Sequence, residues 1–326
     1  MCLRLEAQII PPFLPNAAAL ITTRAATRAG FIEVVIEKNR RATPHLDDAR
    51  ALRSLVLEKC EKPRELLALD EGEKTLVVAA GVSEKASRHL DAEDKREAVR
   101  VSVSEFLEPQ GANWIDELVY RFLLARGDAL GGEMRNAIGA LGQRKLARAL
   151  MAQLRLSELE FHWQHAKLKQ WSIGKVSDAG IENELNGLFW RNKNETRTLL
   201  FNLTPPGFSK NIDLCLAALD PTNFKSAKEL RAALKQPEIY LAFGELKSGF
   251  DPAGADEHWK TARSAFERIR QNYAALNPAT FFVGAAIVPN MADEIWTQLQ
   301  DATLSSAANL TDEMQLAGLC RWLVHL

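Results

Sequence analysis

Two apolar runs with one amphipathic stretch between them place the strongest constraint on the fold of this chain. Residues 239–247 and 280–288 have the length and the apolar content of buried strands. The stretch between them carries one apolar stripe at helical spacing, formed by Trp259, Ala262, Phe266, Ile269 and Tyr273. A strand, a helix and a second strand favour a right-handed crossover between parallel strands. We therefore expect an α/β sheet in the carboxy-terminal half.

Further strands and helices are expected on both sides of this unit. Strand-like runs precede it at residues 198–203 and 212–217. Helices are expected after it at residues 291–299 and 312–326. The carboxy-terminal half is thus predicted to be α/β throughout.

The amino-terminal third is predicted to be mainly helical. Helical periodicity covers residues 16–60 and is expected to break near Pro44, because proline lacks the backbone donor of a helical hydrogen bond. A charged helix is expected at residues 92–107. We therefore predict a mainly helical region, residues 1–125, followed by an α/β core, residues 126–326.

A glycine-rich junction is expected next. An amphipathic run begins at Trp114 and is expected to end at Gly127 and Asp128, and a second long helix is expected at residues 133–156. The glycines before that second helix indicate a close approach of backbone to backbone. They lack the lysine and hydroxyl that would follow in a phosphate-binding loop.

Charge, cysteine content and hydropathy limit the class of protein. The 326 residues include 41 basic and 42 acidic side chains, so the formal charge of −1 neither predicts nor excludes nucleic acid as a partner. The cysteines form no C-x-x-C pair, which argues against a disulfide framework and a zinc site; they are Cys2, Cys60, Cys215 and Cys320. Apolar stretches such as residues 281–288 are shorter than the roughly 20 residues of a membrane span, and the first residues lack the apolar core of a secretory signal. We expect a soluble, cytoplasmic protein without a membrane partner.

Asp213, Glu245 and Lys247 form the candidate catalytic group. Residues two apart on a strand project from the same face, so Glu245 and Lys247 share one face of the run at residues 239–247. Asp213 would point away from the core that its apolar neighbours face. If the two strands are neighbours, Asp213 and Glu245 converge and could hold a hard cation through oxygen ligands, for which Mg²⁺ is the natural choice. This is the layout of a metal-dependent nuclease.

Each group would have a task at a phosphodiester. Two carboxylates and a phosphate within ~4 Å repel by about 4 kcal/mol per pair at an effective dielectric constant of ~20, so a divalent ion must offset that repulsion. Lys247 would stabilise developing negative charge or position the attacking water. His258 lies at the start of the expected helix and could act as general base, because imidazole titrates near neutral pH.

The same residues also fit ordinary structural roles. A Glu-x-Lys spacing occurs as well in Glu93-Asp94-Lys95, where it is expected to be a solvated helix face. Asp213 could face water at a margin of the sheet. His258 could be an unremarkable histidine at a helix start. The short patterns alone therefore leave both interpretations open.

A longer segment resembles a known family. Residues 245–261, which begin with Glu245-Leu246-Lys247, are similar to the signature segment of the AvaI/BsoBI family of type II restriction endonucleases. Further similar segments are spread over most of the chain, at residues 29–32, 37–39, 106–109, 127–132, 134–136 and 308–311. A long, nearly unbroken segment is more specific than any short pattern.

The resemblance implies a fold and a chemistry. The expected fold is the PD-(D/E)xK nuclease core, a central mixed sheet flanked by helices, joined to a helical amino-terminal region that embraces DNA. The family acts as a homodimer on double-stranded DNA, and Mg²⁺ is the expected cofactor. By resemblance, Asp213 and Glu245 match the metal-binding acids, and the carbonyl of Leu246 completes the protein ligands. Lys247 matches the catalytic lysine, and His258 matches the histidine that activates the nucleophile.

The resemblance also implies a target. Family members hydrolyse the phosphodiester at the degenerate palindrome CYCGRG and leave 5′ overhangs, and a palindrome suits a two-fold dimer. Lys85 and Asp251 match contacts to the degenerate base pair. Ser248 and Phe250 depart from the family pattern just before Asp251, so local base contacts are expected to differ. A cognate methyltransferase would protect the host DNA, with no stable complex expected.

Two other functions remain open at this point. One is a PD-(D/E)xK nuclease with another target or a repair role. The other, of a different class, is a DNA-binding relative that has lost cleavage. All four catalytic side-chain types are present, which favours an active enzyme.

Overall fold

The computed structural model describes residues 10–69, 71–175 and 180–326, which divide into two units. One unit consists of Ile138–Leu326 together with the described residues up to Phe31. The other consists of Ile32–Ala137. Helix α5 (Trp114–Leu156) contributes to both, and the boundary expected between residues 125 and 126 falls inside this helix.

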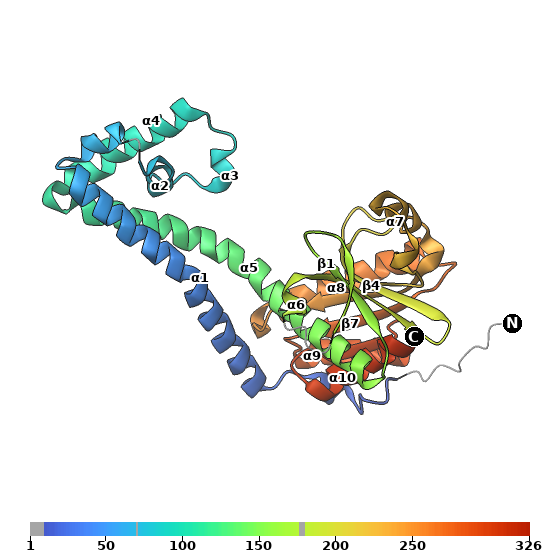
Figure 1. The fold of residues 1–326 in the computed structure, drawn as a ribbon. Helices are drawn as coiled ribbons and strands as arrows, with labels where there is room; N and C mark the ends of the chain where they lie inside the picture. The colour runs from blue at the N-terminus through green and yellow to red at the C-terminus, as the bar shows by residue number, and fades with distance from the viewer. Residues whose placement is uncertain (1–9, 70, 176–179) are drawn as a thin grey trace. The chain divides into compact units, whose positions relative to one another are not determined.

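One mixed sheet organises the larger unit (Figure 1). Its described strands lie in the order β2-β1-β3-β4-β5-β6-β7-β8. They are β1 (Phe161–His165), β2 (Trp171–Ile173), β3 (Leu185–Asn192), β4 (Glu195–Leu203), β5 (Ile212–Ala217), β6 (Tyr240–Lys247), β7 (Ala279–Gly284) and β8 (Ser306–Asn309). Neighbours from β2 to β6 pair antiparallel, whereas β6, β7 and β8 pair in parallel. The predicted parallel pair around one helix, and the mixed α/β fold, are confirmed.

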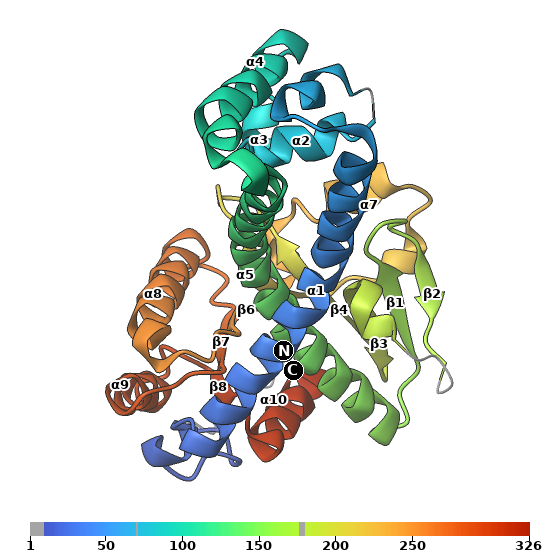
Figure 2. The ribbon, with the colours of Figure 1, turned by 90° about the vertical axis from the view of Figure 1, so that its left-hand side faces the viewer.

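Helices cover both faces of this sheet. They are the carboxy-terminal part of α5, α6 (Ile181–Glu184), α7 (Ala227–Ala233), α8 (Ala255–Asn272), α9 (Pro289–Gln300) and α10 (Glu313–His325), with single turns at Ala17–Leu20, Pro221–Asn223, Pro237–Ile239 and Pro252–Gly254. Helices α8 and α9 lie side by side and share one buried cluster with Phe243 and Phe282 (Figure 2). Helices α5 and α10 share a second cluster with Leu214 and Phe281. Because both faces are buried, the central strands are apolar at nearly every position.

The regular elements of the smaller unit are all helical among its described residues. It contains most of α1 (Arg24–Lys59), the first part of α5, α2 (Glu73–Ala79), α3 (Glu84–Ser87), α4 (Ala92–Ser102), a π-helical turn at Val103–Leu107 and 3-10 turns at Pro63–Ala68 and Glu108–Asn113. Its core is a cluster of buried side chains that includes Val56, Leu66, Leu107 and Phe122. The predicted helical character of this part of the chain is confirmed.

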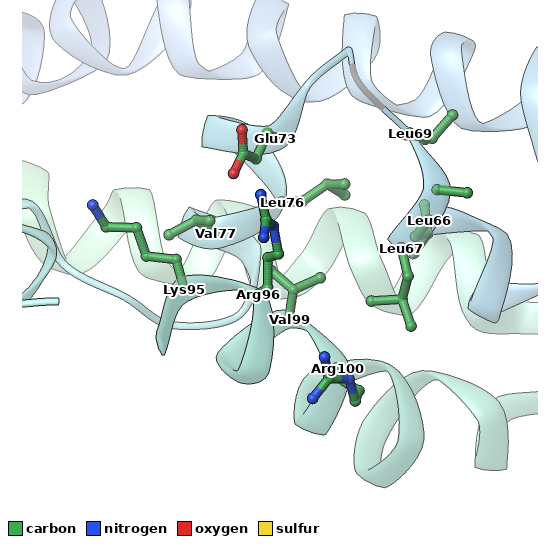
Figure 3. A pocket seen from close by; sticks show the side chains of 11 residues that line it. Leu66, Leu67, Leu69, Glu73, Leu76, Val77, Lys95, Arg96, Val99 and Arg100 are labelled. Carbon is green, nitrogen blue, oxygen red and sulfur yellow. The ribbon is translucent and has the colours of Figure 1, made fainter. Parts of the chain in front are cut away.

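A pocket lies within the smaller unit, beside α2 and α4 (Figure 3). Aliphatic side chains such as Leu76 and Val99 line it, and α4 adds the basic residues Arg96 and Arg100. Glu93 is an ion-pair partner of both arginines, at 3.5 Å and 3.6 Å. Arg96 and Arg100 therefore have an ion-pair partner within their own helix, and Lys95 of the same helix also lines the pocket.

Helix α1 continues through Pro44, so the break predicted there is wrong. Proline removes the hydrogen bond to the carbonyl of Arg40, four residues earlier. Both residues are exposed, so water can donate a hydrogen bond to the freed carbonyl in place of the peptide. A solvated position thus tolerates a proline that would break a buried helix.

Helix α5 continues through the glycine-rich segment, so the predicted junction there is also wrong. A Cβ built at Gly127, Gly131 or Gly132 would meet no described atom within 4 Å. These glycines therefore serve no close backbone approach. Each costs the helix about 1 kcal/mol relative to alanine, which packing elsewhere along the helix offsets.

Three of the four cysteines lie among the described residues. Cys60, Cys215 and Cys320 are buried free thiols, and Cys2 lies outside the described residues. None of the helices formed by the described residues has both the length and the apolar character that crossing a membrane requires.

Candidate active site

Two acidic residues meet at one end of the strand pair β5–β6. The strands are antiparallel neighbours in which Leu214 pairs with Gly244, so Asp213 and Glu245 occupy the adjacent facing positions. The pairing that the sequence analysis required is therefore confirmed. Both side chains lie on the sheet face of Cys215 and Phe243, which belong to the cluster covered by α8 and α9. The face of Asp213 is thus a second core rather than a solvated margin.

The ammonium of Lys247 joins the two carboxylates. Its Nζ donates hydrogen bonds to Oε2 of Glu245 at 2.6 Å and to Oδ2 of Asp213 at 2.9 Å. The same Oδ2 of Asp213 accepts a hydrogen bond from the backbone N–H of Leu246 at 2.9 Å. Three residues predicted from two separate segments therefore form one connected group.

Burial controls the charge of this group. Glu245 is 4% exposed, and burial together with the charge of Asp213 raises the pKa of its carboxyl to about 7. Burial disfavours the charged form of Lys247, but the carboxylates of Glu245 and Asp213 outweigh it and raise the pKa of the ammonium. The thiol of Cys215 has a strongly raised pKa because of its burial and the two acids nearby, so it stays neutral beneath them.

The donor set of this group suits a hard divalent cation. Carboxylate oxygens are available from Asp213 and Glu245. The carbonyl of Lys247 accepts a hydrogen bond from Ala285 on the β7 side. Because successive carbonyls alternate along a strand, that of Leu246 points toward β5, the side of Asp213. No cluster of three or more Asp, Glu, His or Cys side chains in the described chain is arranged for a metal, so the remaining positions of a bound cation would be open to water and to a phosphate oxygen.

His258 approaches this group from the first turn of α8. It is half-buried, and its ring packs on the loop after Lys247 so closely that a Cβ at Gly249 would lie 2.6 Å from its Cε1. Burial and the positive charge of Lys247 lower the pKa of His258 below its usual value, against the opposing carboxylates of Glu257 and Asp251. The imidazole is therefore neutral, and able to accept a proton, at neutral pH.

The two expected base-contacting residues are exposed. Asp251 caps the 3-10 turn Pro252–Gly254, and its Oδ1 accepts a hydrogen bond from Ala253 N at 3.0 Å. Lys85 lies on α3 in the smaller unit. Each is described within its own unit, and their contact with a base pair stays a prediction.

Sequence patterns missed one feature of the site. Ser248 packs against Gly142 of α5, and Phe250 packs against Gly30 of α1. Both glycines stand more than a hundred residues from the loop that they contact. Local spacing holds no signal for such contacts, although the unusual residues at 248 and 250 marked the loop itself.

Comparison with known proteins identifies the family of this chain. The family model of restriction endonuclease BsobI matches residues 13–326. The chain belongs to this family. The type II restriction enzyme AvaI of Nostoc sp. is 46% identical over 309 residues, which cover 94% of this chain and 96% of that enzyme. The enzyme of the same name from Anabaena variabilis matches equally, at 46% over 309 residues.

A relative from another bacterium extends this match. The type II restriction enzyme BsoBI of Geobacillus stearothermophilus is 43% identical over 318 residues, 96% of this chain and 97% of that enzyme. The family resemblance expected from residues 245–261 is thereby confirmed over the whole chain. A member of a restriction endonuclease family thus carries the acid–lysine group described above.

The raised pKa of Glu245 predicts how stability varies with pH. The folded carboxyl titrates at about 7 and the unfolded one near 4.5. Its contribution to the free energy of unfolding is therefore fully present below pH 4.5 and is lost as the pH rises through 7, by on the order of 3 kcal/mol. Glu245→Gln cannot ionise and escapes this loss.

Urea unfolding of metal-free protein in a chelator, at about pH 5 and about pH 8, tests this. We expect Glu245→Gln to become more stable relative to wild type at the higher pH. Glu267→Gln on the exposed side of α8 is the matched control, because that carboxylate stays in water. An unchanged difference between Glu245→Gln and wild type at the two pH values would contradict the assignment.

Proposed function

We propose that this protein is a type II restriction endonuclease that makes Mg²⁺-dependent double-strand cuts in DNA by hydrolysing the phosphodiester. The observation that carries the proposal is the hydrogen bonding of Lys247 Nζ to both Asp213 and Glu245. Membership of the restriction endonuclease family supports the same conclusion. An intact acid–lysine group argues against the inert DNA-binding relative.

Each side chain of the group has a proposed role. Asp213, Glu245 and the carbonyl of Leu246 would hold Mg²⁺, which supplies polarisation of a phosphoryl oxygen and acidification of a bound water. Lys247 would stabilise the negative charge that develops on the phosphate. Its hydrogen bonds to both carboxylates support this role, because the phosphate is proposed to dock beside the cation that these acids would hold.

His258 is the proposed general base. Its lowered pKa keeps the imidazole neutral at neutral pH, so that it can accept a proton from the attacking water. Its ring borders the loop that follows Lys247, which places it near the catalytic group. A positioned imidazole of this kind typically contributes about 10²–10⁴-fold to a rate.

The finer assignments rest on the resemblance. We propose that the protein acts in the cytoplasm as a homodimer whose helical region embraces double-stranded DNA, and that it cuts CYCGRG to leave 5′ overhangs. Lys85 and Asp251 would contact the degenerate base pair, where a donor and an acceptor, acting through water, tolerate either purine. A cognate methyltransferase of the same restriction-modification system would protect host DNA.

Cleavage of a plasmid with one CYCGRG site tests the function. We expect a single linear product with Mg²⁺ and none with excess chelator, because without a divalent cation the carboxylates and the phosphate repel one another. Random nicking would favour a repair nuclease, and tight binding without cutting would favour an inert binder. A plasmid whose one site carries a single substituted base is the control. Mapping the ends at nucleotide resolution gives the cut position.

Lys247→Ala should abolish cutting and spare binding. The variant keeps both acids but loses the charge that faces the phosphate, so we expect cleavage to fall by at least about 10³-fold. DNA binding, measured by fluorescence anisotropy, should change much less. Lys260→Ala, an exposed position on α8, is the matched control. Full activity of Lys247→Ala would remove the catalytic assignment.

His258→Ala tests the general base through the pH profile. With saturating Mg²⁺, the wild-type cleavage rate should fall as the pH drops below the lowered pKa of His258, because the protonated ring cannot accept a proton. The variant should be slower and should lack this fall. A variant profile of the same shape as wild type would mean that His258 does not titrate in the reaction.

A further inference from the structure

The three residues that follow Lys247 are Ser248, Gly249 and Phe250. Each takes part in a close contact in which one of the two partners is a glycine. A Cβ at Gly142 of α5 would lie 2.5 Å from Cβ of Ser248 and 3.1 Å from Cδ2 of Leu310. Gly249 itself contacts His258, and a Cβ there would lie 2.6 Å from the ring Cε1. Real Cβ atoms essentially never lie closer than 3.0 Å to such neighbours, so alanine at Gly142 or Gly249 would require the neighbouring side chain to shift.

The third contact is the most crowded. The ring of Phe250 lies directly on Gly30 of α1, where an added Cβ would overlap the ring and lie 2.8 Å from Cβ of Phe250. Gly30 is buried, and the Phe250 side chain packs against the cluster under α5 and α10. Gly30 and Gly142 belong to the same unit as the loop. Glycine at positions 30 and 142 therefore allows the neighbouring side chains to lie where they do.

The loop is short and has functional groups at both ends. Lys247 precedes it and contacts both acids, and Asp251, the proposed base contact, follows Phe250 directly. Asp251 is fixed in turn by its cap on the 3-10 turn Pro252–Gly254. Each residue of this loop is in close contact with a neighbour. Because packed interiors do not deform freely, a displacement at one end of the loop is transmitted to the other end.

We infer that Gly30 and Gly142 are positioning residues, which hold the loop so that the base contact at Asp251 and the chemistry at Lys247 are coupled. The inference deepens the proposed endonuclease function and rests on it. The two residues in which this loop departs from the family pattern are the two that contact these glycines: Ser248 lies against Gly142, and Phe250 lies against Gly30.

The test is a double-mutant cycle between Gly30 and Phe250 in the full-length protein. Gly30→Ala pushes the ring away, and we expect single-turnover cleavage of the folded fraction to fall by at least about tenfold, since small misplacements of catalytic groups are costly. DNA affinity in a chelator should fall as well, because the same displacement moves Asp251. Phe250→Ala removes the ring and leaves only the 2.8 Å contact with its Cβ, so adding Gly30→Ala to that variant should cost much less activity than it costs the wild type.

The matched control and a second readout separate positioning from simple destabilisation. Gly131→Ala places the same methyl group in a long helix, where a Cβ would meet no described atom beyond its own helical backbone within 4 Å, and should leave cleavage unchanged. Amide hydrogen exchange of residues 246–258 should rise in Gly30→Ala and return toward the Phe250→Ala level in the double variant.

Defined results overturn the inference. Wild-type cleavage by folded Gly30→Ala would refute it, and so would a loss that Phe250→Ala does not relieve, or an equal loss in Gly131→Ala. If the wild-type protein binds its DNA but never cuts, the proposed function fails instead. Hydrogen exchange then still decides whether Gly30 holds the loop.

Discussion

The hydrogen-bonded contact of the Lys247 ammonium with two carboxylates is the interaction on which the rest of the site depends. Glu245 is almost completely buried, and an unpaired carboxylate there would cost several kcal/mol of folding free energy. Lys247 offsets that cost, and the backbone N–H of Leu246 orients Asp213. Even so, the pKa of Glu245 stays at about 7, so the metal-free group holds its second negative charge only weakly. A divalent cation would complete the neutralisation that the lysine begins.

Sheet architecture makes this arrangement possible. The register of β5 against β6 places the two acids opposite one another, and the helices on both faces exclude water from the strands beneath them. The parallel pairing of β6 with β7 requires a crossover, and that crossover is α8, whose first turn carries His258. Acids, lysine and imidazole thus come together because of one strand–helix–strand unit and one neighbouring strand.

Long helices contribute to the site through glycines. Helices α1 and α5 each pack a glycine against the loop after Lys247, whereas a Cβ at the other glycines of α5 would meet no neighbour within 4 Å among the described residues. The same residue type therefore has a packing function at Gly142 and none at Gly131. Residue spacing predicts a close approach in the segment around Gly131, which the structure contradicts, and gives no signal for the contacts at Gly30 and Gly142. Only the distance to a neighbouring atom separates these cases.

The sequence by itself determined the central strands, the crossover helix, the family and the identity of the candidate residues, because hydrophobic periodicity and residue type are local properties. It did not determine that α1 runs through Pro44 or that α5 runs unbroken through its glycines, since exposure and packing elsewhere override local propensity. The tertiary structure alone decided that Asp213 faces a second core and that the pKa of Glu245 is raised. It also placed Gly30 beside Phe250, 220 residues away in the chain (250 − 30). Burial and long-range contact depend on which segments the fold brings together, and no spacing within one segment encodes that.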